Sequence, residues 1–428
     1  MKRFDLSMYE QLIGQFDDGA GLHVIRLKQE VSVDDLQAAL KETLDLHPLC
    51  RTRLMSENGM YYLAYNELEP RALPYEWTTG IQYGTKYNNY YPWFVGYNKD
   101  TLYHSHSHIV SDGGGMLRFL KTLLIRYFAR QGVILPEGTD ITAKDGPAVV
   151  ELSEERAADL TADTGTPVVK PVAADLPAGL YETDPSKLSA YQVSFSKAEI
   201  KKIADEAGTT PFALMASLFA RTYGKVLKEV LGEESGTAVL QVPFDCRRYW
   251  GSITDHNFSC TAYLGYDAAA MKDKSLGEVA KDLRRQLSVY MERKNQLEFF
   301  NRNLKLKKAI EQQPALYDDI KQLLAKELFS TRASLVFSYM GHWMLPLPEE
   351  IESELQDIRI CSNPDPNPLV AVLGGEFGGT ITLSLLQAMK EDLFIRKFRE
   401  VCEENEVPFE LVRVEVPHAS LRFVREAD

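Results

Sequence analysis

Strand patterns and helix patterns alternate twice along this chain, once on each side of a segment that shows neither. That segment, residues 161–179, contains three prolines and little hydrophobic periodicity, which is typical of an extended connection. At 428 residues the chain is long enough to form two cores. The sequence therefore predicts an α/β (α+β) protein made of two lobes.

In the first half, residues 21–28 alternate like a half-buried strand. Ser32–Asp35 then resembles a capping box, which predicts the start of a helix that ends before Pro48. Residues 51–67 read as two strands joined by a tight turn at an Asn-Gly step. A further strand is expected over residues 101–108, and leucines at helical spacing predict a helix from Gly114 onward.

The second half restarts with clear helix signals. A capping box at Ser196–Glu199 predicts a helix that ends at Gly208, and Thr210 and Pro211 predict the N-cap and first residue of the next helix. Further elements of mixed type follow: strands over residues 237–244, 333–341, 380–386 and 411–416, and a helix over 390–405. We predict a first lobe over residues 1–160, a crossover linker over 161–185 and a second lobe over 186–428.

Composition and charge narrow the classes of function. Apolar residues make up 45% and charged residues 25% of the chain, as in globular enzymes. The formal net charge of -13 argues against nucleic acid as a partner. No apolar run reaches the roughly 20 residues of a membrane span, and the N-terminus lacks a secretory pattern. The five cysteines are scattered, so we expect reduced thiols in a cytoplasmic protein.

A run of histidines, HSHSHIVSDGGG at residues 104–115, is the strongest chemical signal. In a strand, His104, His106 and His108 point to the same side, and two imidazoles spaced in this way can bind one metal ion. The remaining histidines form no second cluster, and the HExxH spacing of metal hydrolases is absent. Three interpretations stay open: a metal site, imidazoles satisfied in a partly polar core, and a catalytic base.

The catalytic interpretation needs only the end of the run. His108, Asp112 and Gly113 form an HxxxDG motif where a strand turns into a helix. Imidazole removes protons well near neutral pH because its pKa lies close to the operating pH. The aspartate can hold the turn if a cation neutralises it, and the glycines let a ligand pass close to the backbone.

From this motif outward, the chain resembles the chloramphenicol-acetyltransferase-like superfamily. That superfamily includes nonribosomal peptide condensation domains, plant BAHD acyltransferases and microbial alcohol acetyltransferases. The resemblance covers four segments, in order, over nearly the whole chain: DDLQAALKETLDLHPLCRTRL, SKAEIKKIADEAGTTPFALMASLFARTYGKV, VPFDCRRYWGSITDHNFS and ASLVFSYMG. It implies two related lobes arranged in a V around a central channel.

The resemblance also implies roles for individual residues. His108 matches the catalytic histidine, Gly113 the glycine beside the reacting centre, and Asp112 the aspartate that forms an ion pair. Arg247 best matches the paired arginine, although Arg248 is adjacent. Two features differ from condensation domains: Ser107 replaces a second histidine, and glycines follow the Asp-Gly pair in place of a bulky aromatic residue. Both differences favour the free-standing alcohol acyltransferases.

The implied activity is acyl transfer from a thioester to the hydroxyl or amine of a small-molecule acceptor, with His108 as general base. No cofactor is expected to stay bound; acyl-CoA or acyl-phosphopantetheine on a carrier protein is the expected co-substrate. His104 and His106 are expected to line the same channel wall or to tune its polarity. Asn257, Ser338 and Tyr339 are the candidate oxyanion donors. Two alternatives are a catalytically inactive condensation-like binding module and a histidine-ligated metal hydrolase.

Overall fold

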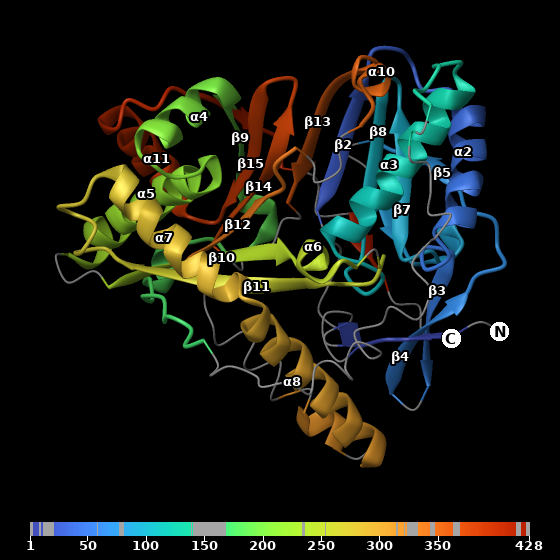
Figure 1. Cartoon of the computed structure of the whole chain (residues 1–428), viewed down its shortest axis with the longest axis horizontal. Coiled ribbons are helices and arrows are strands. Elements are labelled where there is room, and N and C mark those ends of the chain that lie inside the picture. The colour runs from blue at the N-terminus through green and yellow to red at the C-terminus, as the bar shows by residue number, and fades with distance from the viewer. Residues whose placement is uncertain are drawn as a thin grey trace.

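The computed structural model of the chain (Figure 1) describes residues 3–7, 10–11, 21–57, 59–76, 81–137, 139, 168–232, 236–252, 254–313, 316–320, 322, 333–342, 347–362, 369–416 and 421–424. Two mixed sheets stand side by side, and each carries its helices mainly on its outer face. Each sheet has its own apolar core. This architecture is the mixed α/β fold that the sequence predicts.

The sheet of the first half has five strands. Their order is β13 (Leu355–Cys361), β2 (Leu22–Leu27), β8 (Thr101–His106), β7 (Trp93–Asn98) and β5 (Ala72–Pro74). Two helices, α2 (Val33–Leu46) and α3 (Gly113–Arg130), pack together over one face. Their buried side chains, including Leu40, Phe119 and Leu123, form one core with the strands.

The sheet of the second half has seven strands. Their order is β11 (Ser259–Asp267), β10 (Thr237–Asp245), β12 (Leu335–Tyr339), β14 (Val370–Phe377), β15 (Thr380–Gln387), β9 (Ser189–Ser196) and β16 (Glu410–Val414). Four helices flank it: α4 (Lys197–Glu206), α5 (Pro211–Leu231), α7 (Leu276–Met291) and α11 (Leu393–Glu404). Phe219 of α5 stacks on Phe398 of α11, which fixes these two helices over the sheet.

Smaller elements complete the fold. Short sheets are formed by β1 (Arg3–Asp5), β4 (Met60–Tyr65) and β3 (Thr52–Glu57), and by β17 (Leu421–Phe423) with β6 (Ile81–Tyr83). Among the described residues, further α-helices include α6 (Arg247–Trp250), α8 (Arg293–Gln312) and α10 (Glu349–Glu352). Single 3-10 turns occur at Lys86–Asn88, Ala178–Leu180, Pro185–Lys187 and Lys390–Asp392.

Two segments from late in the sequence belong to sheets of the first half. Strand β13 pairs antiparallel with β2, and β17 pairs parallel with β6. Strand β13 also contacts β14 and β15, and Arg359 on β13 donates to Gln192 of β9 across 3.0 Å. The two halves are therefore interlocked. The division into lobes at residues 160 and 186 stays a prediction. Residues 355–361 of the predicted second lobe form a strand of the first-half sheet.

Most helix signals of the sequence are confirmed. Ser196 accepts a hydrogen bond from Glu199 N and Thr210 accepts one from Ala213 N, so both N-caps act as predicted. Ser32 precedes α2, but its side chain makes no capping hydrogen bond to the backbone. The strand expected over residues 101–108 ends at His106. Strands β3 and β4 form the predicted hairpin, whose Asn58 lies outside the described residues.

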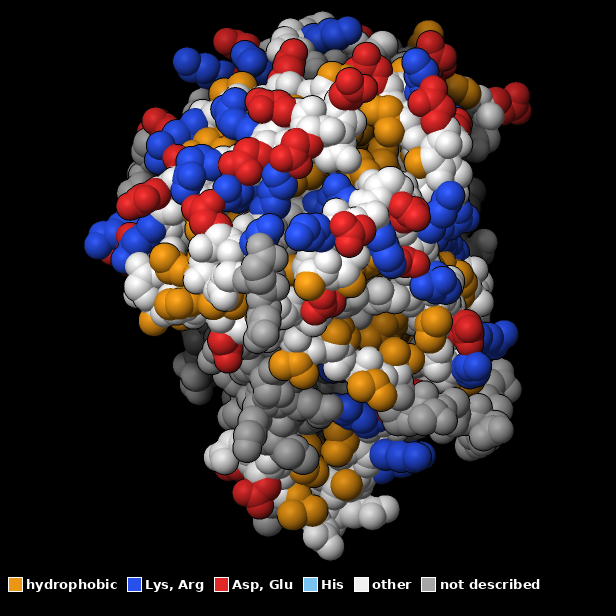
Figure 2. Space-filling model, turned by 90° about the vertical axis from the view of Figure 1, so that its left-hand side faces the viewer, with side chains coloured by type: hydrophobic (Ala, Val, Ile, Leu, Met, Phe, Trp, Pro, Cys, Tyr) orange, Lys and Arg blue, Asp and Glu red, His pale blue; other side chains and the backbone are white. Residues whose placement is uncertain are grey.

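Charged side chains of both signs are interleaved over the face formed by the helices of the second half (Figure 2). Ion pairs join neighbouring helices there: Lys225 of α5 pairs with Glu404 of α11, and Lys397 of α11 pairs with Glu229 of α5. The five cysteines are all buried free thiols. Within the described ranges, every helix is too short or too polar to cross a bilayer.

Candidate active site

The HxxxDG motif lies where β8 turns into α3. His108 follows the strand by two residues and is half-buried. Its Nδ1 lies 3.3 Å from the carbonyl oxygen of Ser111. Because a carbonyl oxygen can only accept, Nδ1 carries the hydrogen and Nε2 is the basic atom of the ring. This tautomer is the one that a general base at Nε2 requires.

The turn that carries His108 is closed by its own backbone and by Ser107. The Ser107 hydroxyl accepts from Ile109 N across 3.2 Å, and the Ser107 carbonyl accepts from Val110 N across 3.1 Å. A short hydroxyl side chain hydrogen-bonds its own backbone in this way more readily than an imidazole does. The serine that replaces a second histidine therefore has a structural role in this turn.

Asp112 connects the turn to the second half of the chain. It is the N-cap of α3 and accepts from Gly115 N across 2.9 Å. Its two carboxylate oxygens receive both terminal nitrogens of Arg247, at 2.8 and 3.2 Å. One of them also accepts from Phe258 N across 2.7 Å. The predicted ion pair between Asp112 and Arg247 is thus present, and it is bidentate.

Each of the three nitrogens of the Arg247 guanidinium has an acceptor. Besides Asp112, these are the carboxylate of Asp245 and the carbonyl oxygens of Thr254 and His256. Both partners of the pair are about 5% exposed, so the guanidinium makes these contacts away from water. Arg248, the alternative arginine, is exposed and contacts Tyr249 instead.

The contacts with Arg247 keep the Asp112 carboxyl group ionised. Burial by itself raises the pKa of a carboxyl group, but the Arg247 charge and the hydrogen bonds from Arg247, Gly115 and Phe258 together lower the pKa of Asp112 below its ordinary value. The pKa of Arg247 is raised: burial lowers it, but the charges of Asp112 and Asp245 outweigh that effect. The two side chains therefore stay ionised as a buried pair.

Asn257 holds the turn that carries His108 from the second half of the chain. Its amide nitrogen donates to the His108 carbonyl oxygen across 2.6 Å and to Glu10 Oε1 across 3.2 Å. Both amide hydrogens are used in this way. Asn257 therefore fixes the backbone of His108 and has no hydrogen left for an oxyanion, which corrects the donor role predicted for it.

The three glycines after Asp112 differ in how closely other atoms pack around them. A Cβ on Gly114 would lie 2.6 Å from Arg247 Nη1, and one on Gly115 would lie 2.5 Å from the carbonyl oxygen of Asp255. A Cβ on Gly113 would have no atom within 4 Å. Gly114 and Gly115 thus let the start of α3 approach the second half, while Gly113 faces open space beside the motif.

His104 and His106 lie in the core of the first half. Each is 1% exposed, and their rings stack at 5.6 Å between centroids. His23 of β2 lies beside them, with its Nδ1 3.2 Å from that of His104. Burial lowers the pKa of His104 and of His106 well below the ordinary value and that of His23 to about 4, so all three rings are neutral. We had predicted that His104 and His106 line a channel wall. The structure places both side chains in the core of the first half instead.

Ser338 and Tyr339 lie half-buried on β12. The Tyr339 hydroxyl donates to Glu376 across 3.2 Å, and Glu376 pairs with Lys197. Burial and the Glu376 charge raise the pKa of Tyr339. The Tyr339 hydrogen is therefore committed to a carboxylate. Of the three predicted oxyanion donors, Ser338 stays a prediction.

His23, His104 and His106 form one cluster of rings in the core of the first half. Across the part of the chain that the structure describes, no three His, Cys, Asp or Glu side chains are placed to hold one ion. Two Nδ1 atoms that face each other at 3.2 Å share a hydrogen instead. This geometry gives the metal hydrolase interpretation no support.

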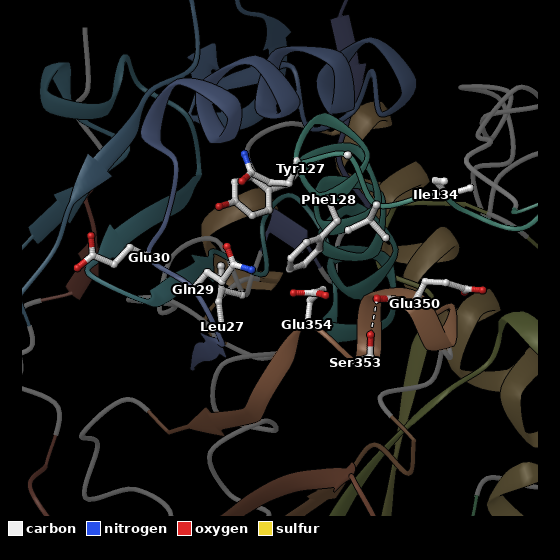
Figure 3. A pocket seen from close by; sticks show the side chains of 12 residues that line it. Leu27, Gln29, Glu30, Tyr127, Phe128, Ile134, Glu350, Ser353 and Glu354 are labelled. Atoms are coloured by element: carbon white, nitrogen blue, oxygen red, sulfur yellow. Dashed lines mark hydrogen bonds between the residues drawn. The ribbon is translucent and has the colours of Figure 1, made fainter.

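A hollow of about 390 Å³ lies at the other end of α3 (Figure 3). Its lining combines apolar and acidic side chains: Leu27, Gln29, Glu30, Tyr127, Phe128, Gln131, Gly132, Val133, Ile134, Glu350, Ser353 and Glu354. From Asp112 to Phe128 the helix rises about 24 Å at its usual 1.5 Å per residue. The hollow is therefore remote from His108, and its carboxylates would repel a phosphate-bearing donor.

No family model and no curated protein sequence matches this chain. Solved structures do. TRI101 of F. graminearum, solved with ethyl coenzyme A, matches with a TM-score of 0.64 at 12% identity, over 96% of this chain and 99% of that one. Polyketide synthase associated protein 5 of Mycobacterium tuberculosis matches with a TM-score of 0.58 at 14% identity, over 94% and 97% of the two chains. The epimerization domain of the third module of tyrocidine synthetase B matches with a TM-score of 0.56 at 13% identity, over 95% of each.

The chain has the chloramphenicol-acetyltransferase-like fold. The matches cover nearly all of both partners, so the likeness is one of whole architecture. The fold expected from the sequence resemblance is confirmed at identities that sequence comparison does not detect. Both free-standing proteins and a synthetase domain share it.

Several residues around His108 belong to no motif that the sequence analysis used. Glu10, Ser111 and Asp255 are buried: Ser111 donates to the Asp255 carbonyl oxygen, and Glu10 accepts from Asn257. Asp255 lies inside the segment TDHNFS, whose Asn-Phe pair is part of the family resemblance, so that segment was the available signal. Glu10 lies in a stretch with no motif, and its partner Asn257 is 247 positions away.

Gly113 and Gly114, at the start of α3, give a matched pair of substitutions. Gly114→Ala is expected to lower the free energy of unfolding by about 1–3 kcal/mol, because Arg247 is held on all sides and cannot move away from the new methyl group. Gly113→Ala adds the same methyl group in open space and is expected to leave stability unchanged or slightly raised. Urea unfolding followed by tryptophan fluorescence measures both. Equal losses would contradict the packing described for Gly114.

Asp112→Asn is expected to make stability less dependent on pH. A carboxylate whose pKa is lowered by folding stabilises the protein above its unfolded pKa of about 3.9, and this contribution is lost as the pH falls through the folded-state value. The wild type should exceed the variant by about 3 kcal/mol at pH 7, with Asp245 still facing Arg247, and by less below about pH 4. Unfolding free energies from pH 7 to pH 3 test this. A difference that stays constant with pH would show that the Asp112 charge is not involved.

Proposed function

We propose that this protein transfers an acyl group from a thioester to a hydroxyl or amine acceptor, with His108 as general base. One observation carries the proposal: His108 presents Nε2 as its basic atom on a turn held by Ser111, Asn257 and the Asp112–Arg247 pair. A base that must accept a proton at one atom gains from having its other nitrogen fixed as a donor.

The reaction needs no covalent enzyme intermediate. His108 Nε2 takes the proton of the acceptor as the acceptor oxygen or nitrogen attacks the thioester carbonyl carbon. A tetrahedral oxyanion forms, the carbon–sulfur bond breaks, and the imidazolium returns the proton to the leaving thiolate. Positioned base catalysis of this kind contributes roughly 10²–10⁴ in rate. Asp112 and Arg247 touch neither reactant in this scheme and act by positioning the turn.

The thioester and the acceptor are proposed as classes. TRI101 structures were solved with coenzyme A and with T-2 mycotoxin or deoxynivalenol, which supports acyl-CoA as a donor and a small molecule as an acceptor here. A nonribosomal peptide synthetase, FmoA3, also matches over 95% of this chain, which keeps acyl-phosphopantetheine on a carrier protein as the second donor. Gly113 faces open space beside His108, where a narrow reactant can approach the backbone.

Thiol release from a panel of acyl-CoAs, with pooled alcohols and amines, tests this function. The wild type is expected to release thiol only when an acceptor is present, and His108→Ala is expected to lower that rate by at least about 10²-fold. His342→Ala is the matched control, because His342 is a half-exposed histidine paired with Glu352 away from the motif.

The outcomes separate the candidates. Equal activity in wild type and His108→Ala would contradict the role of His108. If no acyl-CoA is used, the same panel on acyl carrier protein is run next. Turnover with neither donor would overturn the enzymatic proposal in favour of a binding module without activity.

A further inference from the structure

We propose that His47, at the end of α2, is a positioning residue for His108. It acts through Asp255 and Ser111. The inference deepens the function proposed above and rests on it only where turnover is measured. No motif assigned a role to His47, which lies in the first half, 61 positions before His108 in the sequence.

His47 is fixed at both ring nitrogens. Nδ1 lies 2.8 Å from Asp255 Oδ2, and Nε2 lies 2.9 Å from Thr122 Oγ1 on α3. A carboxylate only accepts, so Nδ1 donates to Asp255. The ring also packs edge-on against Phe119, at 5.7 Å between centroids. These contacts hold the imidazole in one orientation between α3 and the second half.

Both side chains of the His47–Asp255 pair are buried. The side chains are 2% and 1% exposed. The nearest other charge, Arg118, has its Nε 3.9 Å from Asp255 Oδ1, and that oxygen accepts no hydrogen bond from the described residues. The Cys50 thiol also faces this carboxylate, and burial together with the Asp255 charge raises the pKa of Cys50. His47 is therefore the main hydrogen-bonding partner of a buried carboxylate.

The backbone of Asp255 connects His47 to the turn that carries His108. Its carbonyl oxygen accepts the Ser111 hydroxyl. The carbonyl oxygen of Ser111 is the acceptor that fixes the hydrogen on His108 Nδ1. A shift of Asp255 would move Ser111 and loosen the contact that selects the His108 tautomer. The neighbouring residues, Thr254 to Phe258, also bind Arg247, Asp112 or His108.

This chain of contacts predicts an effect that loss of packing alone would not cause. If His47 only fills space, its replacement lowers stability and leaves the His108 ring unchanged in the folded protein. If His47 positions Asp255, its replacement lets the His108 ring sample the tautomer with hydrogen on Nε2. In that tautomer Nε2 cannot accept a proton. The tautomer of His108 is therefore the deciding observable.

The test uses the full chain labelled with ¹⁵N-histidine, without substrate. Long-range ¹H–¹⁵N spectra report which ring nitrogen of His108 carries hydrogen, and His108→Gln identifies the signals. The wild type is expected to show hydrogen on Nδ1, and His47→Gln is expected to show both tautomers. In turnover, kcat should fall roughly 10²-fold, the effect of a misplacement near 1 Å, with KM kept.

Three further variants sharpen the result. Asp255→Asn keeps the size of the side chain and carries the same prediction if His47→Gln does not fold. The double variant His47→Gln with Asp255→Asn can form an amide–amide hydrogen bond and is expected to regain part of the Nδ1 signal. His342→Gln, at the exposed pair with Glu352, should change nothing.

A folded His47→Gln protein with the wild-type His108 tautomer would overturn the proposal. If the wild type has no turnover with any donor, the proposed function fails, but the tautomer measurement still decides the positioning role.

Discussion

The bidentate pair between Asp112 and Arg247 is the interaction on which the rest of the site depends. It joins the N-cap of α3 in the first half to the first residue of α6, two positions after β10, in the second half, with both side chains about 5% exposed. Removing water from two charges costs free energy, and the structure compensates because every guanidinium nitrogen of Arg247 donates to an acceptor. A buried charge that loses its partner is strongly destabilising, so neither half can shift without the other.

Several local features follow from that constraint. At the start of α3, a Cβ atom on Gly114 would meet Arg247, and one on Gly115 would meet the carbonyl oxygen of Asp255. A larger residue at either position would push these second-half groups away. Residues 254–258 then meet the motif one after another, through Arg247, Ser111, His108 and Asp112. The turn that carries His108 is held by its own residues, Ser107 and Ser111, and by Asp255 and Asn257 of the second half. This arrangement is rigid where a general base needs fixed geometry, and it leaves the space beside Gly113 open.

The sequence predicted what is encoded locally. The N-caps Ser196 and Thr210 and the Asn-Gly hairpin depend on neighbouring residues, so their patterns were sufficient. Strand β13 was missed because its pairing with β2 spans more than 300 positions, and no local pattern reports such a register. In the site, His108, Asp112 and Arg247 came from the family resemblance. The period of two placed His104 and His106 on one face, but it did not show that this face packs against α3. Asp255 and Glu10 bind partners over 200 positions away and had no motif of their own.

A double-mutant cycle between Asp112 and Arg247 tests the central claim most directly. Unfolding free energies of Asp112→Asn, Arg247→Gln and the double variant give the coupling between the two side chains, with Arg248→Gln as the neighbouring control. The contacts described here predict a coupling of about 1.5 kcal/mol or more for Arg247 and additivity for Arg248. Additive effects at Arg247, within about 0.5 kcal/mol, would show that the pair does not hold the two halves together.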